Sequence, residues 1–471
     1  MPLPTESERE LEAHTVALNR WLYAEGIGLD VEPDGYAAPA QALAGLYEHL
    51  RDAPDPVLRV CALENWSEAR RLPLDNAITA ALDEHVQAAE YACSEGPLTW
   101  RNWKAFERET QAAGLLADAY ARLNAAAQAV TPLLEERLAA LRADFASQAT
   151  TPVHTFCARE ALTPERLRAL LIDAGTQARP AFAAALEALS RTVWGRAAGP
   201  AEFHALYLNR MYEPTDRLFV EAAAAPETVV ARAQAHFRQS GFDLSMVPVD
   251  LANRPRKYPG AFCFPVAIPG DVRVSVRVAT PHHLVDMLYH ELGHAAHFSG
   301  IDPALPFVDR YWIHAGTHET FSTLFEYLLA EPAFLAEELG LRPAGVDALL
   351  AFARFKQLLT AAWSGAQALT ALETWLEALR WPAVEQRFAA WAERFTGLAV
   401  PAGSARLDPF VSAASIYPAG YVLAEARVGR WRPKLKALGG EAWWRSPAAQ
   451  ADIRARLWAG GRAQLAEHCG V

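Results

Sequence analysis

The chain has 471 residues, 52% of them hydrophobic, so it can bury a substantial core in one large helical body or in two or three domains. Its net charge of −11 and its lack of Lys and Arg runs argue against nucleic acid or anionic membrane surfaces as partners. Peptides or other small substrates fit this charge balance better.

The cysteines and the first residues indicate a compartment. The five cysteines are widely spaced and form no CxxC pair, which favours reduced thiols. The first residues lack the basic and then apolar regions of a signal peptide, and the chain has no run of 18 apolar residues. We therefore expect a cytoplasmic protein that neither crosses nor binds a membrane.

Residues 5–195 show the Ala- and Leu-rich periodicity of helices. Thr5 and Glu8 form a capping box at the first helix, and Thr163 begins a later helix that Gly175 can end. The segment 195–200, rich in Gly and Pro, is a plausible hinge. We predict an N-terminal helical region at residues 1–199 and a catalytic region at residues 200–471, with one continuous fold as the alternative.

The periodicity changes from helical to alternating after Val247. Residues 262–264 and 272–278 alternate apolar and polar side chains around a turn at 269–271, which predicts a β-hairpin. The edge of this hairpin can add an extended peptide as a further strand. A purely structural hairpin is an equal alternative.

Residues 280–300 predict a single helix, with Thr280 as its N-cap, Pro281 at the first position and Gly300 at its end. His290 and His294 lie four apart on one face, so both imidazoles can bind one metal ion while Glu291 reaches the metal's water. This is the HExxH signature of zinc hydrolases. The alternative is a solvated helix with surface histidines.

Two histidines leave a catalytic zinc site incomplete, because such a site usually has three protein ligands and one open position. The extended HExxHxxGxxH pattern is excluded, since Gly300 stands where the third His would be. The next helical segment, residues 317–326, places Glu319, Ser322, Thr323 and Glu326 on one face. Glu319 is therefore the candidate third ligand.

These features resemble the thimet oligopeptidase and oligoendopeptidase F family of zinc peptidases. The 24 residues between His294 and Glu319 match that family's spacing, and the segment HETFSTLFE at 318–326 looks like its third-ligand motif. Residues 250–262 are similar to the family's segment before the active-site strands. Residues 417–421 resemble its tyrosine-bearing loop, so the resemblance covers about residues 250–430.

The resemblance implies a mainly α fold, with a large helical body, a deep substrate channel, an HExxH zinc-peptidase core and a small β-hairpin or sheet beside the active site. We expect one Zn²⁺ per chain, held by His290, His294 and Glu319. Glu291 is then the general base that acts on zinc-activated water. The hydroxyl of Tyr417 or Tyr421 is expected to stabilise the oxyanion, with ordinary packing as an equal alternative for both rings.

We therefore predict a zinc metallopeptidase, an oligoendopeptidase that hydrolyses internal bonds of short unstructured peptides. One alternative is a helical zinc carboxypeptidase of the Taq type, whose third-ligand motif also begins with His-Glu, as His318-Glu319 does here. Another is a non-catalytic zinc-containing peptide-binding protein, which would not need a general base such as Glu291. The expected partners are short peptides, with no nucleic acid and no membrane, and the sequence leaves the oligomeric state open.

Overall fold

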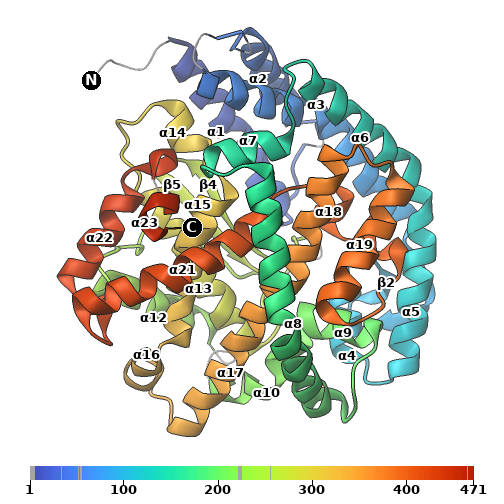
Figure 1. Ribbon diagram of the computed structural model, residues 1–471, viewed down its shortest axis with the longest axis vertical. Coiled ribbons are helices and arrows are strands. Elements are labelled where there is room, and N and C mark those ends of the chain that lie inside the picture. The colour runs from blue at the N-terminus through green and yellow to red at the C-terminus, as the bar shows by residue number, and fades with distance from the viewer. Residues whose placement is uncertain are drawn as a thin grey trace. The chain divides into compact units, whose positions relative to one another are not determined.

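The computed structural model describes residues 6–32, 34–50, 52–53, 56–220, 225–254, 256–463 and 465–470. Thr5, from the predicted capping box, and Pro255, from the segment before the strands, lie outside these residues. The described chain is mainly α-helical with two small sheets, which confirms the predicted fold class (Figure 1).

The chain forms two compact units, each built from separate stretches of sequence. The first unit contains Met1–Arg70, Thr215–Ala353 and Leu423–Val471, and the second contains Arg71–Pro214 and Arg354–Val422. Both sides of the predicted 199/200 boundary lie in the second unit, so the division into regions 1–199 and 200–471 stays a prediction.

The first unit holds a three-stranded sheet and the helices around it. Among the described residues, the α-helices that lie wholly inside this unit are α1 (Glu6–Gly26), α2 (Ala37–Leu50), α12 (Pro226–Gln239), α13 (Pro281–Ser299), α14 (Phe307–Tyr311), α15 (Ala315–Glu326), α16 (Pro332–Glu337), α22 (Pro447–Leu457) and α23 (Leu465–Cys469). Helices α3 (Pro56–His85), α10 (Glu213–Asp216), α17 (Pro343–Leu359) and α21 (Pro418–Gly439) each contain a boundary between the units.

The predicted hairpin is present as β4 (Ala261–Ala267) and β5 (Asp271–Val276), which pair antiparallel. A short strand that the sequence did not indicate, β3 (Val249–Asp250), pairs with β5 in parallel, so the strand order is β3-β5-β4. Strand β4 therefore lies at one edge of the sheet. Helix α13 packs against β4 and β5, and α1 packs against β4.

The core of the first unit forms where α13, α15 and the sheet meet (Figure 1). Leu284, Leu288 and Leu292 lie four residues apart along α13 and are fully buried, as the apolar stripe of an amphipathic helix requires. From α15, Phe321 and Leu324 enter the same core. This packing fixes the two helices that carry the HExxH motif and Glu319.

The second unit is also largely helical. Its strands and the α-helices that lie wholly inside it are β1 (Gln87–Cys93), β2 (Gly96–Thr99), α4 (Trp103–Glu109), α5 (Ala113–Ala126), α6 (Thr131–Ala146), α7 (Pro152–Arg159), α8 (Pro164–Trp194), α9 (Pro200–Leu208), α18 (Gly365–Leu376), α19 (Trp381–Thr396) and α20 (Pro409–Ser412).

Two expectations for the N-terminal half were wrong. Residues 87–99 form the antiparallel hairpin β1-β2 in place of a helix, because Ala88, Tyr91 and Leu98 enter a local core. Helix α8 also does not end at Gly175. A Cβ atom on Gly175 would lie 2.6 Å from the Phe395 ring, so this glycine permits close packing inside a helix that continues to Trp194.

No helix among the described residues combines the length and the apolar character that crossing a membrane requires.

Candidate metal centre

Helix α13 presents the HExxH motif within the core of the first unit. The Thr280 hydroxyl accepts a hydrogen bond from the His283 N–H at 3.4 Å, which confirms the predicted N-cap. The helix ends at Ser299, one residue before Gly300. Most residues of this helix are buried, on all of its faces. The histidines of the motif are therefore not surface groups on a solvated helix.

Gly293, inside the motif, lets α13 approach α15 closely. A Cβ atom at this position would lie 2.7 Å from the Ser322 Cα and 3.0 Å from the Ser322 carbonyl oxygen. Only glycine avoids that clash, and the close approach brings Glu319 opposite the two histidines. The sequence pattern does not indicate this role, although Gly293 is the only glycine between the N-cap and the end of the predicted helix.

The three expected ligands come together. The Oε2 atom of Glu319 lies 3.4 Å from His290 Nε2 and 3.5 Å from His294 Nε2, and one ligand atom from each residue falls within 4.8 Å of the others. Two ligands about 2.1 Å from a tetrahedral centre lie about 3.4 Å apart. The donor set and its spacing therefore fit a tetrahedral metal ion such as zinc with a fourth position open.

Neighbouring side chains orient two of these ligands. The Nδ1 atom of His290 lies 2.7 Å from Glu326 Oε2, and the Ser322 hydroxyl donates to Glu319 Oε2 at 3.1 Å. Burial lowers the pKa of His290, but its contacts with Glu319 and Glu326 outweigh burial and raise that pKa well above its usual value. Burial opposes ionisation of Glu319, yet His294 and His290 hold its pKa well below the usual range. The carboxylate is thus ready to bind a cation.

Glu291 lies beside the three ligands and is buried. The backbone N–H of Cys263 on β4 is directed at this carboxylate and favours its ionised form. Burial raises the pKa of Glu291 and outweighs the opposing effect of His290 and His294. A carboxylate with a raised pKa is a better proton acceptor near neutral pH.

A buried lysine braces the strands that carry Cys263. The Lys257 ammonium donates to Asp250 Oδ1 at 2.7 Å, to the Asp250 carbonyl at 2.9 Å and to the Val276 carbonyl at 3.0 Å. Arg254 binds both carboxylate oxygens of Asp250, at 3.0 and 2.9 Å. These contacts join the segment before β4 to β3 and β5. Lys257 and Arg254 therefore stabilise this sheet.

Two further histidines lie near the ligands without joining them. His297 is fully buried and packs against the rings of Phe298 and Phe321, with centroids 5.3 and 4.3 Å away. Burial lowers its pKa well below the usual value. Burial also lowers the pKa of His318 to about 3, so both rings are neutral at physiological pH.

Tyr417 and Tyr421, which are predicted to stabilise the oxyanion, belong to the second unit. The metal centre belongs to the first. The Tyr417 ring stacks on Phe410 at 5.7 Å, and the Tyr421 ring lies 5.4 Å from that of Tyr417. Both are partly exposed. Their action on the oxyanion stays a prediction.

No protein-family model matches the chain, and no curated protein matches its sequence. Solved structures do match. One, described as "Structure of Pyrococcus furiosus Carboxypeptidase Apo-Mg", aligns with a TM-score of 0.58 and 11% identity over 99% of this chain and 96% of its own. Another, described as "The Structure of CHT", aligns with a TM-score of 0.56 and 13% identity over 99% of this chain and 95% of its own. The chain shares its fold with both.

Proposed function

We propose that the protein is a cytoplasmic zinc metallopeptidase with one Zn²⁺ per chain, acting on internal bonds of short unstructured peptides. The observation that carries this proposal is the convergence of His290, His294 and Glu319 beside the buried carboxylate of Glu291. Three ligands with an adjacent proton acceptor are what metal-assisted hydrolysis requires, whereas a structural zinc needs no such acceptor.

A zinc ion held here would supply Lewis acidity, which polarises a carbonyl and lowers the pKa of water. The chain's own residues do the rest. Glu326 keeps the proton of His290 on Nδ1, so that Nε2 stays a lone-pair donor toward the metal. Ser322 fixes the rotamer of Glu319 through its hydroxyl.

Glu291 is the proton carrier in this proposal. Its carboxylate takes a proton from the attacking water as the new C–O bond forms, and then passes that proton to the leaving amine as the C–N bond breaks. The Cys263 N–H, directed at this carboxylate, favours its ionised form before the first transfer. Water is consumed, and one acid and one amine are released.

A carboxypeptidase is the second candidate, because a structure with this fold is described as a carboxypeptidase. The two activities can be distinguished with two sets of peptides, one with a free and one with an amidated C-terminus. The early products of each set are identified by mass spectrometry. We expect internal cuts in both sets. Stepwise loss of C-terminal residues from the free peptides alone would assign the carboxypeptidase activity. No cleavage of any peptide by zinc-loaded protein would refute both.

A further inference from the structure

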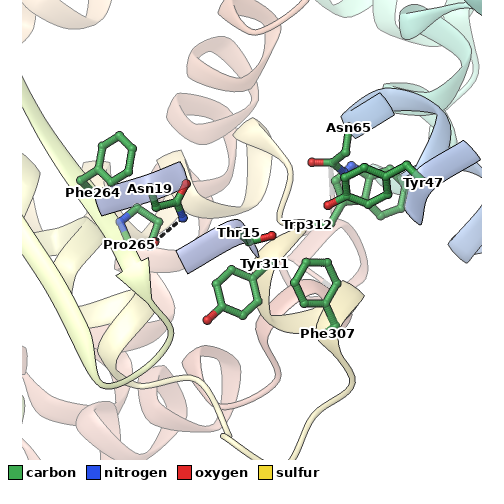
Figure 2. Close-up of a pocket in the computed structure, with 9 residues that line it drawn as sticks. All are labelled: Thr15, Asn19, Tyr47, Asn65, Phe264, Pro265, Phe307, Tyr311 and Trp312. Atoms are coloured by element: carbon green, nitrogen blue, oxygen red, sulfur yellow. Dashed lines mark hydrogen bonds between the residues drawn. The ribbon is translucent and has the colours of Figure 1, made fainter. Parts of the chain in front are cut away.

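A cavity of about 210 Å³ lies in the first unit, among α1, α2, α3, β4 and α14 (Figure 2). Five of its lining side chains are aromatic: Tyr47, Phe264, Phe307, Tyr311 and Trp312. None of its lining residues is charged. An apolar cavity of roughly 150 Å³ is enough to hold benzene, so this one has room for a substituted aromatic ring.

Two asparagines line this cavity. The Asn19 amide donates to the Pro265 carbonyl at 3.0 Å, and the Asn65 amide donates to the Cys61 carbonyl at 2.8 Å. An amide oxygen cannot face a carbonyl oxygen, so these bonds fix the orientation of both side chains. Figure 2 shows the Asn65 amide oxygen directed toward the space between the labelled residues. A ligand with a hydrogen-bond donor fits this oxygen.

Two of the aromatic walls are held in place through their polar atoms. The Trp312 indole N–H donates to Glu64, while the Tyr311 hydroxyl donates to Glu12 and accepts from the Ile268 N–H, both at 3.0 Å. The rings therefore present fixed apolar surface to the cavity. The Arg310 guanidinium carbon lies 5.3 Å from the Tyr311 ring centroid, and its two terminal nitrogens donate to the Glu12 carboxylate at 2.7 and 2.6 Å, so its charge is paired.

The cavity lies close along the chain to the contact with the proposed catalytic base. Cys263, whose backbone N–H is directed at Glu291, and Pro265, whose carbonyl accepts from Asn19 beside the cavity, are two residues apart on β4, so their backbone groups lie along the same edge of the strand. Two residues of strand span about 7 Å. An extended peptide whose reacting carbonyl lies beside Glu291 therefore has a neighbouring side chain within reach of the cavity.

We infer that this cavity is an aromatic subsite, which takes a Tyr or Trp side chain next to the scissile bond of the substrate. The inference rests on the proposed peptidase function. The phenol or indole N–H donates to the Asn65 amide oxygen while the ring fills the space between the aromatic walls. Phe fills the same space without that hydrogen bond.

Binding of side-chain analogues tests the cavity without catalysis. We would titrate p-cresol, 3-methylindole and toluene into the full chain and follow binding by ligand-observed NMR. p-Cresol should bind about fivefold more tightly than toluene, the size of one net hydrogen bond of about 1 kcal/mol. Asn65→Leu should reduce that ratio to about one while toluene still binds.

The matched control is Asn124→Leu. Asn124 makes the same kind of amide contact one helical turn back, to the Tyr120 carbonyl at 2.7 Å, but does not line the cavity. It should leave the ratio of p-cresol to toluene affinity unchanged. Absence of binding by all three analogues, or tighter binding of tetramethylammonium than of p-cresol, would refute the aromatic site.

Peptide cleavage tests the link to substrate. Peptides that differ only by Tyr, Phe or Ala at the positions flanking the cut should show the lowest KM for Tyr at one position. Asn65→Leu should remove the preference of Tyr over Phe. Equal KM values for all three residues would refute the subsite. Analogue binding without any peptide cleavage would overturn the proposed function and the substrate role, and leave an aromatic-binding cavity.

Discussion

The Oε2 atom of Glu326, the last residue of α15, lies 2.7 Å from the Nδ1 atom of His290 on α13. A carboxylate on the outer nitrogen of a metal-binding histidine fixes its tautomer and orientation and raises its basicity as a ligand. The same helix carries Glu319, so α15 supplies one proposed ligand directly and orients a second.

The first prediction concerns Glu326→Gln. The amide still fills the site but carries no charge, so His290 loses its anionic partner. We expect zinc affinity to fall by about 10- to 100-fold, measured by competition with a fluorescent chelator. The control is Glu337→Gln, which removes a carboxylate that pairs with Arg445 on the surface. Unchanged affinity in Glu326→Gln would show that the contact does not support the metal.

The second prediction concerns Glu291→Gln. The variant keeps the three ligands, so zinc content should stay near one per chain, whereas turnover should fall by about 10²- to 10⁴-fold. In the parent, kcat/KM should decline as the pH falls through the pKa of Glu291, which burial places above its usual value. Near-parental turnover in the variant would assign the proton transfer to another group.

The third prediction concerns Gly293→Ala. Its new methyl group would lie 2.7 Å from the Ser322 Cα, so α13 and α15 must separate. We expect a loss of about 1 to 3 kcal/mol in the free energy of unfolding, together with weaker zinc binding. Denaturant titration with and without zinc measures both.

The matched control for Gly293→Ala is Gly429→Ala. Gly429 lies inside α21, and a Cβ atom there meets no atom within 4 Å. Replacement should stabilise the helix by up to about 1 kcal/mol. If both variants gain stability, the close contact between α13 and α15 is not a constraint.

The sequence predicted the parts of the site that depend on spacing along one helix. The positions of His290, Glu291 and His294 follow from the helical period, and the face of the next helix selected Glu319. The alternation of apolar and polar side chains predicted the strands β4 and β5. In each of these cases the informative pattern lies within about ten consecutive residues.

What the sequence could not predict depends on contacts between distant segments. The role of Gly293 follows from a neighbour on another helix, and the Cys263 N–H reaches Glu291 only after β4 packs on α13. The aromatic subsite combines residues from Thr15 to Trp312. No short sequence pattern contains such contacts, and the predicted helix end at Gly175 is wrong for the same reason.

The fourth prediction concerns His297→Leu. The buried ring stays neutral because burial lowers its pKa, while the unfolded chain takes up a proton at the ordinary value of about 6.5. Below that pH the unfolded state binds more protons, so the stability of the parent falls as pH falls. The variant lacks this loss. The difference in the free energy of unfolding between the variant and the parent should therefore grow by about 1 kcal/mol in favour of the variant when the pH is lowered from 6 to 5.

Urea unfolding in the presence of a chelator measures this difference without a contribution from zinc release. His49→Leu is the control, because His49 is exposed on α2 and should follow the parent at each pH. Parallel pH curves for the parent and His297→Leu would mean that the ring binds its proton at the same pH in the folded and unfolded chain.

The last prediction concerns Tyr417 and Tyr421. A phenol that donates to the developing oxyanion acts only as charge forms, so its loss lowers kcat more than it raises KM. Tyr→Phe removes the hydroxyl and keeps the ring packing with Phe410. We expect at least one single variant to lose about 10²- to 10³-fold in kcat, the usual effect of one oxyanion donor.

Zinc content should stay unchanged in both Tyr→Phe variants, because neither tyrosine belongs to the ligand group. This separates the transition-state role from a defect in the metal centre. A double Phe variant that keeps kcat within about threefold of the parent falls well short of one donor's effect. The tyrosines would then be packing residues around Phe410, and the charge on the oxyanion would be stabilised at the metal centre of the first unit.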